Sequence, residues 1–408
     1  MGGNVPTRCA FRTLFVGVVR LAPSTFHTVL VKEDGTAWSS GVNADGSSTS
    51  FVQVMPSGAT AAAAGIGYSM VLKQDGSVWV AGKNSYGQLG DGSRSSKRAF
   101  SRVQRIPLAK AVAAGGYHSM ILMEDGFVWG TGWNKYGQLG DGSKIYKQRF
   151  FRVLSSYGSI AVATGNDHSL LLKQDGSVWA TGRNFNGQLG GTTKSHSGRF
   201  HETMFSGAKA IAAGDVHSIV LKQDGSVWAA GRNQNGQLGD GSKTDRNSFV
   251  NVMSSGAVSV AAGGSHSMVL MQDGSVLATG WNKYGQLGDG STVDRINYVQ
   301  VVVSATKSVA AGGRHSMILK QDGHAWATGY NEYGQLGTGD TVDKKVFAQV
   351  IVDGANAIAA GGIHSMVIKQ DGSIWTIGLY KEGEFGDEKK WTVTKETYVR
   401  LASFHNGL

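Results

Sequence analysis

The sequence predicts an all-β protein, a β-propeller built from four-stranded blades, and three observations lead to this fold class. A unit of about 50 residues recurs along the chain. Every unit contains two apolar segments joined by Asp-Gly, which is the strongest short-range signal of a β-hairpin. Glycine makes up 60 of the 408 residues, so helices are unfavourable throughout. A period near 50 is typical of propellers and solenoids.

The repeat is clearest when "HSMVLMQDGSVLATGWNKYGQLGDGS", which begins at His266, is compared with the rest of the chain. Its part "TGWNKYGQLGDGS" occurs letter for letter at 131–143 and 279–291. The hairpin glycine recurs eight times, at spacings of 41, 50, 50, 49, 49, 49 and 49 residues. These glycines are Gly35, Gly76, Gly126, Gly176, Gly225, Gly274, Gly323 and Gly372. We therefore count eight units, of which the first lacks about nine residues after Gly46.

Each unit is expected to form four strands. The run "SMVLM" at 267–271 is apolar almost throughout, as expected for a strand covered on both faces of its sheet. It joins "SVLATG" through Asp-Gly, a small-residue run such as "AIAAG" at 210–214 precedes the hairpin, and a run such as "SFVNVM" at 248–253 follows the glycine-rich loop. Small side chains suit the first strand because the innermost strands of a propeller crowd together at its axis.

A tryptophan follows the hairpin turn in every unit except one, where Leu277 takes its place. A buried indole removes about 150–250 Å² from water, an upper bound of roughly 4–6 kcal/mol. We expect these residues to hold neighbouring blades together. They are Trp38, Trp79, Trp129, Trp179, Trp228, Trp326 and Trp375.

A histidine begins the second strand of seven units, and Tyr68 stands in the eighth. A ring of imidazoles can in principle hold a metal or sense pH. One histidine per blade is too widely spaced for three to share one ion at about 2 Å, and each precedes Ser or Thr. We therefore expect no metal site and a structural role, in which the imidazole bonds to backbone groups of its own blade. The histidines are His27, His118, His168, His217, His266, His315 and His364.

The glycine-rich loop does not fit a nucleotide-binding P-loop. In "GQLGDGSK" at 137–144, Ser143 precedes Lys144, no helical pattern follows, and the string recurs in most units. We expect the glycines instead to provide the backbone angles that a tight connecting loop needs. No Ser–His–Asp set, carboxylate pair or cofactor fingerprint stands apart from the repeat, so we expect neither an enzyme nor a cofactor. Cys9 is the single cysteine, which excludes a disulfide within the chain.

The net charge of +10 is concentrated between Lys83 and Arg152, where twelve Lys or Arg face four acids. Two neighbouring long loops carry most of these cations, interleaved with Phe100, Tyr146, Phe150 and Phe151. We predict one basic, aromatic-rich patch that binds an acidic protein surface or a nucleic-acid backbone. The alternative is a solvated charged rim. The predicted contacts are Arg94, Lys97, Arg98, Arg102, Arg105, Lys144, Lys147, Arg149 and Arg152.

The pattern G-x-H-S-x-x-L-x-x-D-G-x-V-W-x-x-G-x-N-x-x-G-Q-L-G-x-G resembles the repeat of the regulator of chromosome condensation family, to which a β-lactamase-inhibitor protein and the plant ultraviolet-B photoreceptor also belong. The resemblance covers about 18–401 and implies a propeller, seven-bladed in that family. This chain has eight units, and the last reads "GEFG" at 383–386 instead of "GQLG". Seven and eight blades both stay open at this point.

We expect an N-terminal extension over 1–17, one propeller over 18–401 and a tail over 402–408. No apolar run is long enough to span a bilayer, and "RTLFVGVV" lacks a clear signal-peptide cleavage site. These features favour a cytoplasmic or nuclear monomer.

The sequence favours a non-enzymatic protein-interaction platform that binds an acidic partner through variable blade loops. The resemblance implies two alternatives from the family: a guanine-nucleotide exchange factor for a small GTPase or a chromatin-associated regulator, and a secreted inhibitor. Exchange in that family uses a protruding β-hairpin wedge, for which the even spacing leaves no room. Light sensing is not expected, because "GGRHS" at 312–316 has Gly313 where the photoreceptor's motif has Trp.

Overall fold

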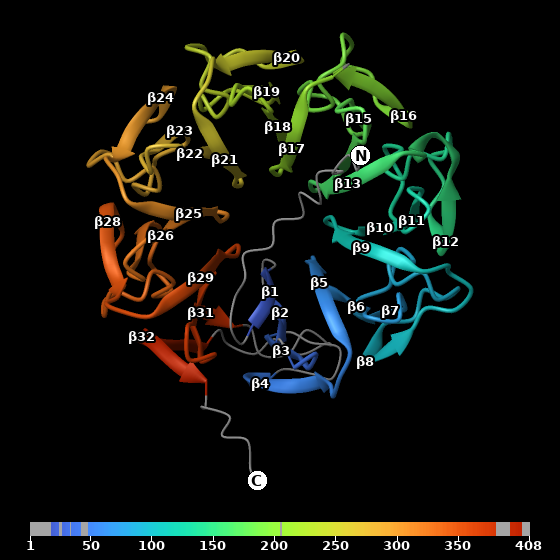
Figure 1. The fold of residues 1–408 in the computed structure, drawn as a ribbon, viewed down its shortest axis with the longest axis horizontal. Coiled ribbons are helices and arrows are strands. Elements are labelled where there is room, and N and C mark those ends of the chain that lie inside the picture. Colours follow the sequence, from blue (N-terminus) through green and yellow to red (C-terminus); the bar gives the residue numbers. More distant parts are fainter. Residues whose placement is uncertain are drawn as a thin grey trace, which may run out of the picture.

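The computed structural model describes residues 18–23, 27–32, 34–41, 48–204, 206–380 and 392–401. These residues form eight four-stranded antiparallel sheets around a central axis (Figure 1). The all-β propeller is confirmed, and the chain builds eight blades, one for each sequence unit. The predicted extension with Cys9, the "GEFG" segment at 383–386 and the tail at 402–408 lie outside the described residues.

The first half of the ring consists of blades 1 to 4. Blade 1 contains β1 (Val18–Pro23), β2 (His27–Lys32), β3 (Ala37–Gly41) and β4 (Ser48–Met55). Blade 2 contains β5 (Ala59–Gly65), β6 (Tyr68–Lys73), β7 (Val78–Gly82) and β8 (Lys97–Arg102). Blade 3 contains β9 (Ala109–Ala114), β10 (His118–Met123), β11 (Val128–Gly132) and β12 (Lys147–Val153), followed by the 3-10 turn η1 (Leu154–Ser156). Blade 4 contains β13 (Ser159–Thr164), β14 (His168–Lys173), β15 (Val178–Gly182) and β16 (Ser197–Met204).

The second half consists of blades 5 to 8. Blade 5 contains β17 (Ala208–Ala213), β18 (His217–Lys222), β19 (Val227–Gly231) and β20 (Arg246–Met253). Blade 6 contains β21 (Ala257–Ala262), β22 (His266–Met271), β23 (Val276–Gly280) and β24 (Arg295–Val302). Blade 7 contains β25 (Thr306–Ala311), β26 (His315–Lys320), β27 (Ala325–Gly329) and β28 (Lys344–Ile351). Blade 8 contains β29 (Ala355–Ala360), β30 (His364–Lys369), β31 (Ile374–Tyr380) and β32 (Thr392–Leu401).

Within each blade the strands pair in chain order, with the first strand at the axis and the fourth at the rim (Figure 1). We call the side of the ring that carries the Asp-Gly hairpin turns the turn face. The opposite side, which carries the glycine-rich loops between third and fourth strands, we call the loop face. First strands such as β17 are rich in alanine and line the central channel, as their small side chains predict.

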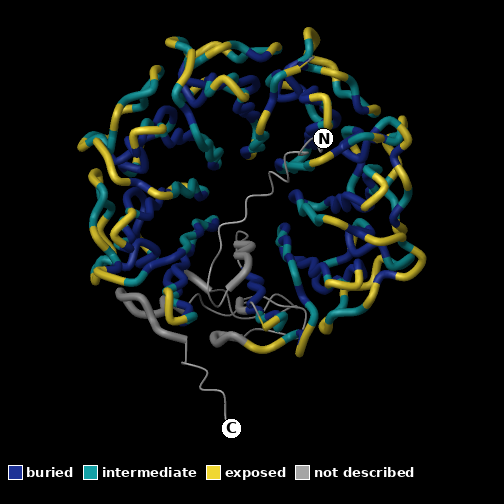
Figure 2. The backbone as a smooth tube through the Cα atoms, viewed as in Figure 1, coloured by how far each residue is buried: buried dark blue, intermediate teal, exposed yellow. Residues whose placement is uncertain are grey.

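The second strands are buried on both faces because each blade packs against two neighbours (Figure 2). One core cluster joins Met120 and Leu122 of blade 3 to Leu171 of blade 4, and Trp179 of blade 4 packs against it. The half-buried tryptophans thus lie between blades. The ring closes in the same way, because Leu30 and Trp38 of blade 1 pack with Met366 of blade 8.

Each repeated histidine bonds to the blade that follows its own. His118 Nε2 lies 2.9 Å from Ser169 Oγ, and His364 Nε2 lies 2.7 Å from Thr28 Oγ1, which closes the ring. In blade 2, the Tyr68 hydroxyl donates to the His118 carbonyl instead. The expected bond to backbone groups of the histidine's own blade is therefore wrong: the acceptor is a hydroxyl across the interface. Equivalent pairs are His27–Ser69, His168–Ser218, His217–Ser267, His266–Ser316 and His315–Ser365.

The same serine fixes the proton on the imidazole. Ser169 Oγ–H donates to the Gln138 carbonyl of blade 3 at 2.9 Å, so Oγ accepts from His118 Nε2–H. His118 Nδ1 has no hydrogen-bond partner among the described residues. Burial lowers the pKa of His118 to about 3 and that of His217 to about 4. We call the ring of histidine–hydroxyl pairs between blades the belt; its imidazoles are therefore neutral. No group of three or more His, Cys, Asp or Glu in the described part of the chain could hold a metal ion.

The glycine-rich loop packs against the next blade in the ring. In blade 3, Asn134 accepts from Leu139 N–H and donates to the Ile145 carbonyl, which folds the loop into a compact unit. Gly137 and Gly140 have positive φ angles of 84° and 74°. A Cβ on Gly140 would stand 2.3 Å from the Phe200 ring of blade 4, so a side chain cannot be accommodated there. The loop is an interblade contact, as the exclusion of a P-loop suggested.

The stability of the ring is expected to fall as the pH drops below about 6.5, where histidines of the unfolded chain become protonated. The buried histidines stay neutral down to about 3 or 4, so the unfolded state binds more protons in this range. Each such histidine lowers the free energy of unfolding by up to about 1.4 kcal/mol for every pH unit below the pKa of the unfolded chain. Above that pKa its contribution to stability is fully present. Circular dichroism should show a steep drop of Tm between about pH 7 and about pH 5. Equal Tm values at both pH values would contradict the neutral belt.

Removing one belt hydroxyl is expected to destabilise the whole ring. Ser169→Ala leaves both the His118 Nε2–H and the Gln138 carbonyl buried without a partner, at a cost of about 1–3 kcal/mol. Ser195→Ala, in an exposed loop of the same blade, is the matched control and should change stability by less than about 0.5 kcal/mol. Urea unfolding of both variants measures the difference. Equal stabilities would show that the belt hydrogen bonds contribute nothing.

Candidate functional site

The nine predicted basic contacts follow the rim of blades 2 and 3 from one face of the ring to the other. Arg94 and Lys144 lie in the loops that lead into β8 and β12, at the loop face. Arg102 and Arg152 lie opposite Trp79 and Trp129, at the turn-face ends of β8 and β12. Arg105 follows β8 and has a positive φ of 61°. The remaining four, Lys97, Arg98, Lys147 and Arg149, lie on β8 and β12.

Lys97 and Lys147 are engaged in ion pairs within their own blades. Lys97 Nζ lies 2.9 Å from Asp91 Oδ2, and Lys147 Nζ lies 2.9 Å from Asp141 Oδ2. Burial alone would raise the pKa of Asp141, but hydrogen bonds from Lys147 and Ser143 bring the pKa below its usual value. Arg246 and Arg295 form the same pair with Asp240 and Asp289 in blades 5 and 6. Lys97 and Lys147 therefore act as parts of the repeat.

One further rim cation, Arg149, contacts the neighbouring blade. Arg149 of blade 3 bridges to Asp91 of blade 2 through the main chain, and its guanidinium group lies against Gly92. Arg98, Arg102 and Arg149 are exposed at the rim. The interleaved aromatics behave differently: Phe150 packs in the core between blades 2 and 3, and Phe100 packs against the core of blade 1. The rim patch is thus basic, while these two rings stabilise the fold.

An aromatic cluster, of which the sequence predicted only Tyr146, lies on the loop face of blades 2 and 3. The Tyr86 and Trp133 ring centroids are 4.3 Å apart, Trp133 stacks on Tyr146 at 4.7 Å, and Tyr117 lies 5.3 Å from Tyr86. Burial raises the pKa of Tyr146, and the nearby charge of Arg94 opposes that shift. The cluster therefore adjoins one of the predicted basic residues.

A second group of rings continues this surface into blade 4. Phe185 exposes 56% of its surface and lies 4.2 Å from the His196 ring, which in turn lies 4.9 Å from Tyr136. Burial lowers the pKa of His196, and the nearby charges of Lys144 and Arg183 lower it further. We call the loop-face surface over blades 2 to 4 the aromatic–basic face. It consists of Tyr86, Arg94, Tyr117, Trp133, Lys135, Tyr136, Lys144, Tyr146, Arg183, Phe185 and His196.

The signal for this face was present inside the repeat. In "TGWNKYGQLGDGS" the Asn, the glycines and the Gln build the loop, whereas Trp133 and Tyr136 occupy positions at which blades 4 and 5 carry Arg and Asn and blade 6 carries the same Trp and Tyr. Side chains at these positions contact rings of the neighbouring blade, as Tyr86 does with Trp133 and Tyr136 does with His196. Aromatic residues at these two positions of consecutive units are therefore the sequence signal for such a surface.

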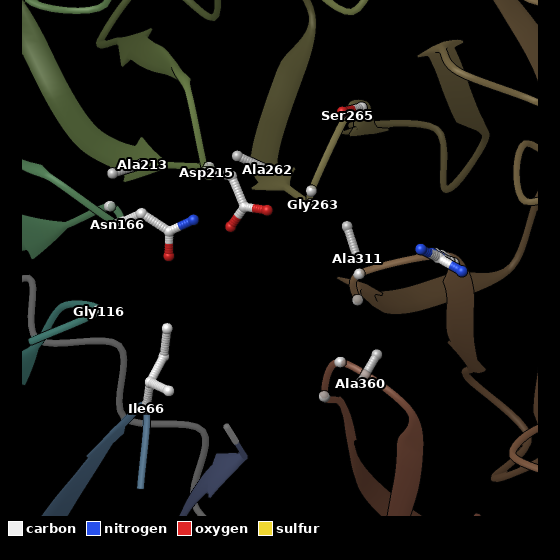
Figure 3. A pocket seen from close by; sticks show the side chains of 18 of the residues that line it. Ile66, Gly116, Asn166, Ala213, Asp215, Ala262, Gly263, Ser265, Ala311 and Ala360 are labelled. Carbon is white, nitrogen blue, oxygen red and sulfur yellow. The ribbon is translucent and has the colours of Figure 1, made fainter. Parts of the chain in front are cut away.

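The central channel opens on the loop face as a cavity of about 650 Å³ (Figure 3). Its lining comes mainly from the ends of the first strands and is dominated by glycine and alanine. Asn166 and Asp215 project into it from blades 4 and 5. Blades 6 and 7 contribute Trp281, Arg314 and Tyr330, and the Arg314 guanidinium lies 5.6 Å from the Tyr330 ring centroid.

The comparisons with known proteins agree with this architecture. The family model of the RCC1-like domain matches residues 47–354. Human WBSCR16 is 23% identical, with a TM-score of 0.66, over 78% of this chain and 89% of its own. Yeast RCC1 (Prp20) bound to Kap60 is 21% identical, with a TM-score of 0.69, over 89% of this chain and 93% of its own. Prp20p from Saccharomyces cerevisiae, studied for its binding to Gsp1p and histones, is 22% identical, with a TM-score of 0.66, over 85% of this chain and 91% of its own. No curated protein matches the sequence significantly.

The single helical segment formed by the described residues, the 3-10 turn η1, is too short to cross a membrane.

Charge reversal at Lys147 is expected to destabilise the fold, because the glutamate would stand beside Asp141, whose side chain is only 9% exposed. We expect Lys147→Glu to lower the free energy of unfolding by about 1–2 kcal/mol. Lys144→Glu makes the same charge change at an exposed position three residues earlier and should alter stability by less than about 0.5 kcal/mol. Urea unfolding measures both. Equal losses would contradict a structural role for the Lys147–Asp141 pair.

Proposed function

Because this chain belongs to the RCC1-like domain family, we propose that it is a non-enzymatic protein-interaction platform that binds an acidic partner. The contact surface is the aromatic–basic face together with the exposed rim arginines Arg98, Arg102 and Arg149. The observation that carries this proposal is that cations and accessible aromatic rings share one face of the ring over three consecutive blades.

The chemistry of this surface suits a protein interface. Tyr, Trp and Arg are the residue types that dominate interface energetics, because they bury large areas and also offer hydrogen bonds. Ile145 and Phe185 expose 69% and 56% of their surfaces next to Lys144 and Arg183. A partner that presents carboxylates around an apolar centre would satisfy both kinds of side chain.

The similar structures support a binding role in general terms. Yeast RCC1 was solved with Kap60, and Prp20p was studied for its binding to Gsp1p and histones. Nucleotide exchange on a small GTPase, the alternative suggested by the family resemblance, has no specific observation in its favour. Blades 2 to 7 contain four strands each, and their described residues form no additional hairpin that could act as a wedge.

Charge reversal at the rim should abolish partner capture without unfolding the protein. The triple variant Arg98→Glu, Arg102→Glu and Arg149→Glu, in which Lys97 and Lys147 are kept because they pair with Asp91 and Asp141, places repulsion across the interface. We expect at least a tenfold loss of the captured partner, about 1.4 kcal/mol or more. Affinity purification from the native source, with quantitative mass spectrometry, measures the loss.

The matched control carries the same charge change on blades 5 and 7. Lys209, Lys243 and Lys345 are exposed, and their triple replacement by Glu should leave capture within about twofold of the unaltered protein. Capture that survives the Arg98, Arg102 and Arg149 replacements would exclude the rim patch. Capture that is lost on nuclease treatment and falls steeply with salt would identify nucleic acid as the ligand instead.

A further inference from the structure

The mouth of the central channel contains a carboxylate and an amide side chain that the fold does not use. The Asp215 carboxylate and the Asn166 amide make no hydrogen bond or ion pair with any residue that the structure describes. Both project into the same cavity from adjacent blades (Figure 3). Convergent, unsatisfied polar groups in a concave site are the usual signature of a ligand-binding position.

These two residues interrupt a regular feature of the ring. At the equivalent position, the main-chain N–H of Ile66, Gly116, Gly264 and Gly313 donates to a carbonyl of the next blade at 3.0–3.2 Å. No such bond is made by Asn166 or Asp215 among the described residues. At the three glycines of this set a Cβ would stand 2.8–3.0 Å from a carbonyl oxygen of the next blade. Glycine occupies three of the four joined positions, and the polar side chains occur where this bond is not made.

The local charge distribution selects the kind of ligand. Asp215 is exposed to the channel, while the protein that surrounds the mouth raises the pKa of its carboxyl group to about 6, so it is an anion at neutral pH without a counter-ion among the described residues. The carboxylate lies close to Gly264 of the next blade, where a Cβ would stand 3.3 Å from Asp215 Oδ2. A cationic hydrogen-bond donor would satisfy the carboxylate and the Asn166 carbonyl oxygen together.

A metal ion and an anion fit this corner less well. A divalent cation needs several oxygen ligands, whereas the described residues place one carboxylate and one amide here. The cation that the mouth already contains, Arg314, stands two blades away and lies 5.9 Å from Trp281 and 5.6 Å from Tyr330. Because Arg314 stands two blades from Asp215, it does not pair with this carboxylate. A cationic ligand group can therefore bind at Asp215.

We propose that the mouth of the central channel binds a primary ammonium group, with Asp215 as its counter-ion and Asn166 as its second hydrogen-bond partner. The group belongs either to a free polyamine or to a lysine side chain of a protein. The cavity of about 650 Å³ is wide enough for such an extended chain to enter from the loop face. This site differs from the aromatic–basic face in position and in the sign of charge it attracts, so it does not rest on the proposed function.

The test is a titration of the full chain followed by NMR of isoleucine methyl groups, because Ile66 and Ile363 line the mouth and report on it locally. Spermidine and a tetralysine peptide are the two probes, and tetra-acetyl-lysine peptide is the uncharged control. Saturable shifts of the Ile66 and Ile363 methyls are expected with at least one charged probe. Binding of spermidine identifies a free amine as sufficient, and binding of the peptide alone identifies a protein side chain.

Two variants assign the contact. Asp215→Asn removes the counter-ion and should weaken binding at least tenfold, about 1.4 kcal/mol. Its Tm should be no lower than that of the unaltered protein, since the exposed Asp215 side chain makes no hydrogen bond or ion pair with the described residues that the change could break. Arg314→Gln removes a like charge from the same cavity and should leave binding equal or tighter. Absence of shifts at Ile66 and Ile363, unchanged affinity of Asp215→Asn, or equal loss in Arg314→Gln would each overturn the proposal.

Discussion

The structure depends on one constraint: the second strand of every blade is buried on both of its faces and therefore needs a blade on each side. Strands such as β10 and β14 expose almost nothing to water. A single four-stranded sheet cannot cover both faces of such a strand. An open row of blades would leave two apolar faces in water. The packing of Leu30 and Trp38 against Met366 removes that problem by joining blade 1 to blade 8.

The polar interior follows from the same constraint. Polar groups held between two blades must find partners there, and the chain solves this with one arrangement repeated around the axis. The imidazole donates to the next blade's hydroxyl, which donates back to a glutamine carbonyl. In blade 2, Tyr68 performs the same joining function with a different chemical group. Side-chain hydrogen bonds therefore cross all eight interfaces, and the ring is held by direction-specific contacts in addition to apolar packing.

Much of this architecture could be predicted from the repeat, and the misses have identifiable causes. The strand order and the eight units follow from the Asp-Gly period. The partner of each histidine could not be found from sequence, because it lies about 50 residues away in a different blade. The roles of Lys97 and Lys147 could have been found: a basic residue six positions after the loop aspartate recurs as Asp240–Arg246 and Asp289–Arg295. The aromatic–basic face was predicted only in part, through Arg94, Lys144 and Tyr146 of the variable loops. Trp133, Tyr136 and Phe185 were not predicted, because they lie inside the repeated motif, where a structural role was expected.

Amide hydrogen exchange of the second strands tests the closed eight-bladed ring most directly. In a closed ring every blade has two neighbours, so β2, β6, β10, β14, β18, β22, β26 and β30 should exchange slowly and at the same rate, through one cooperative opening. An open stack of repeats unfolds from its ends. Fast exchange in β2 and β30 with protection rising toward β14 and β18 would contradict the closed ring.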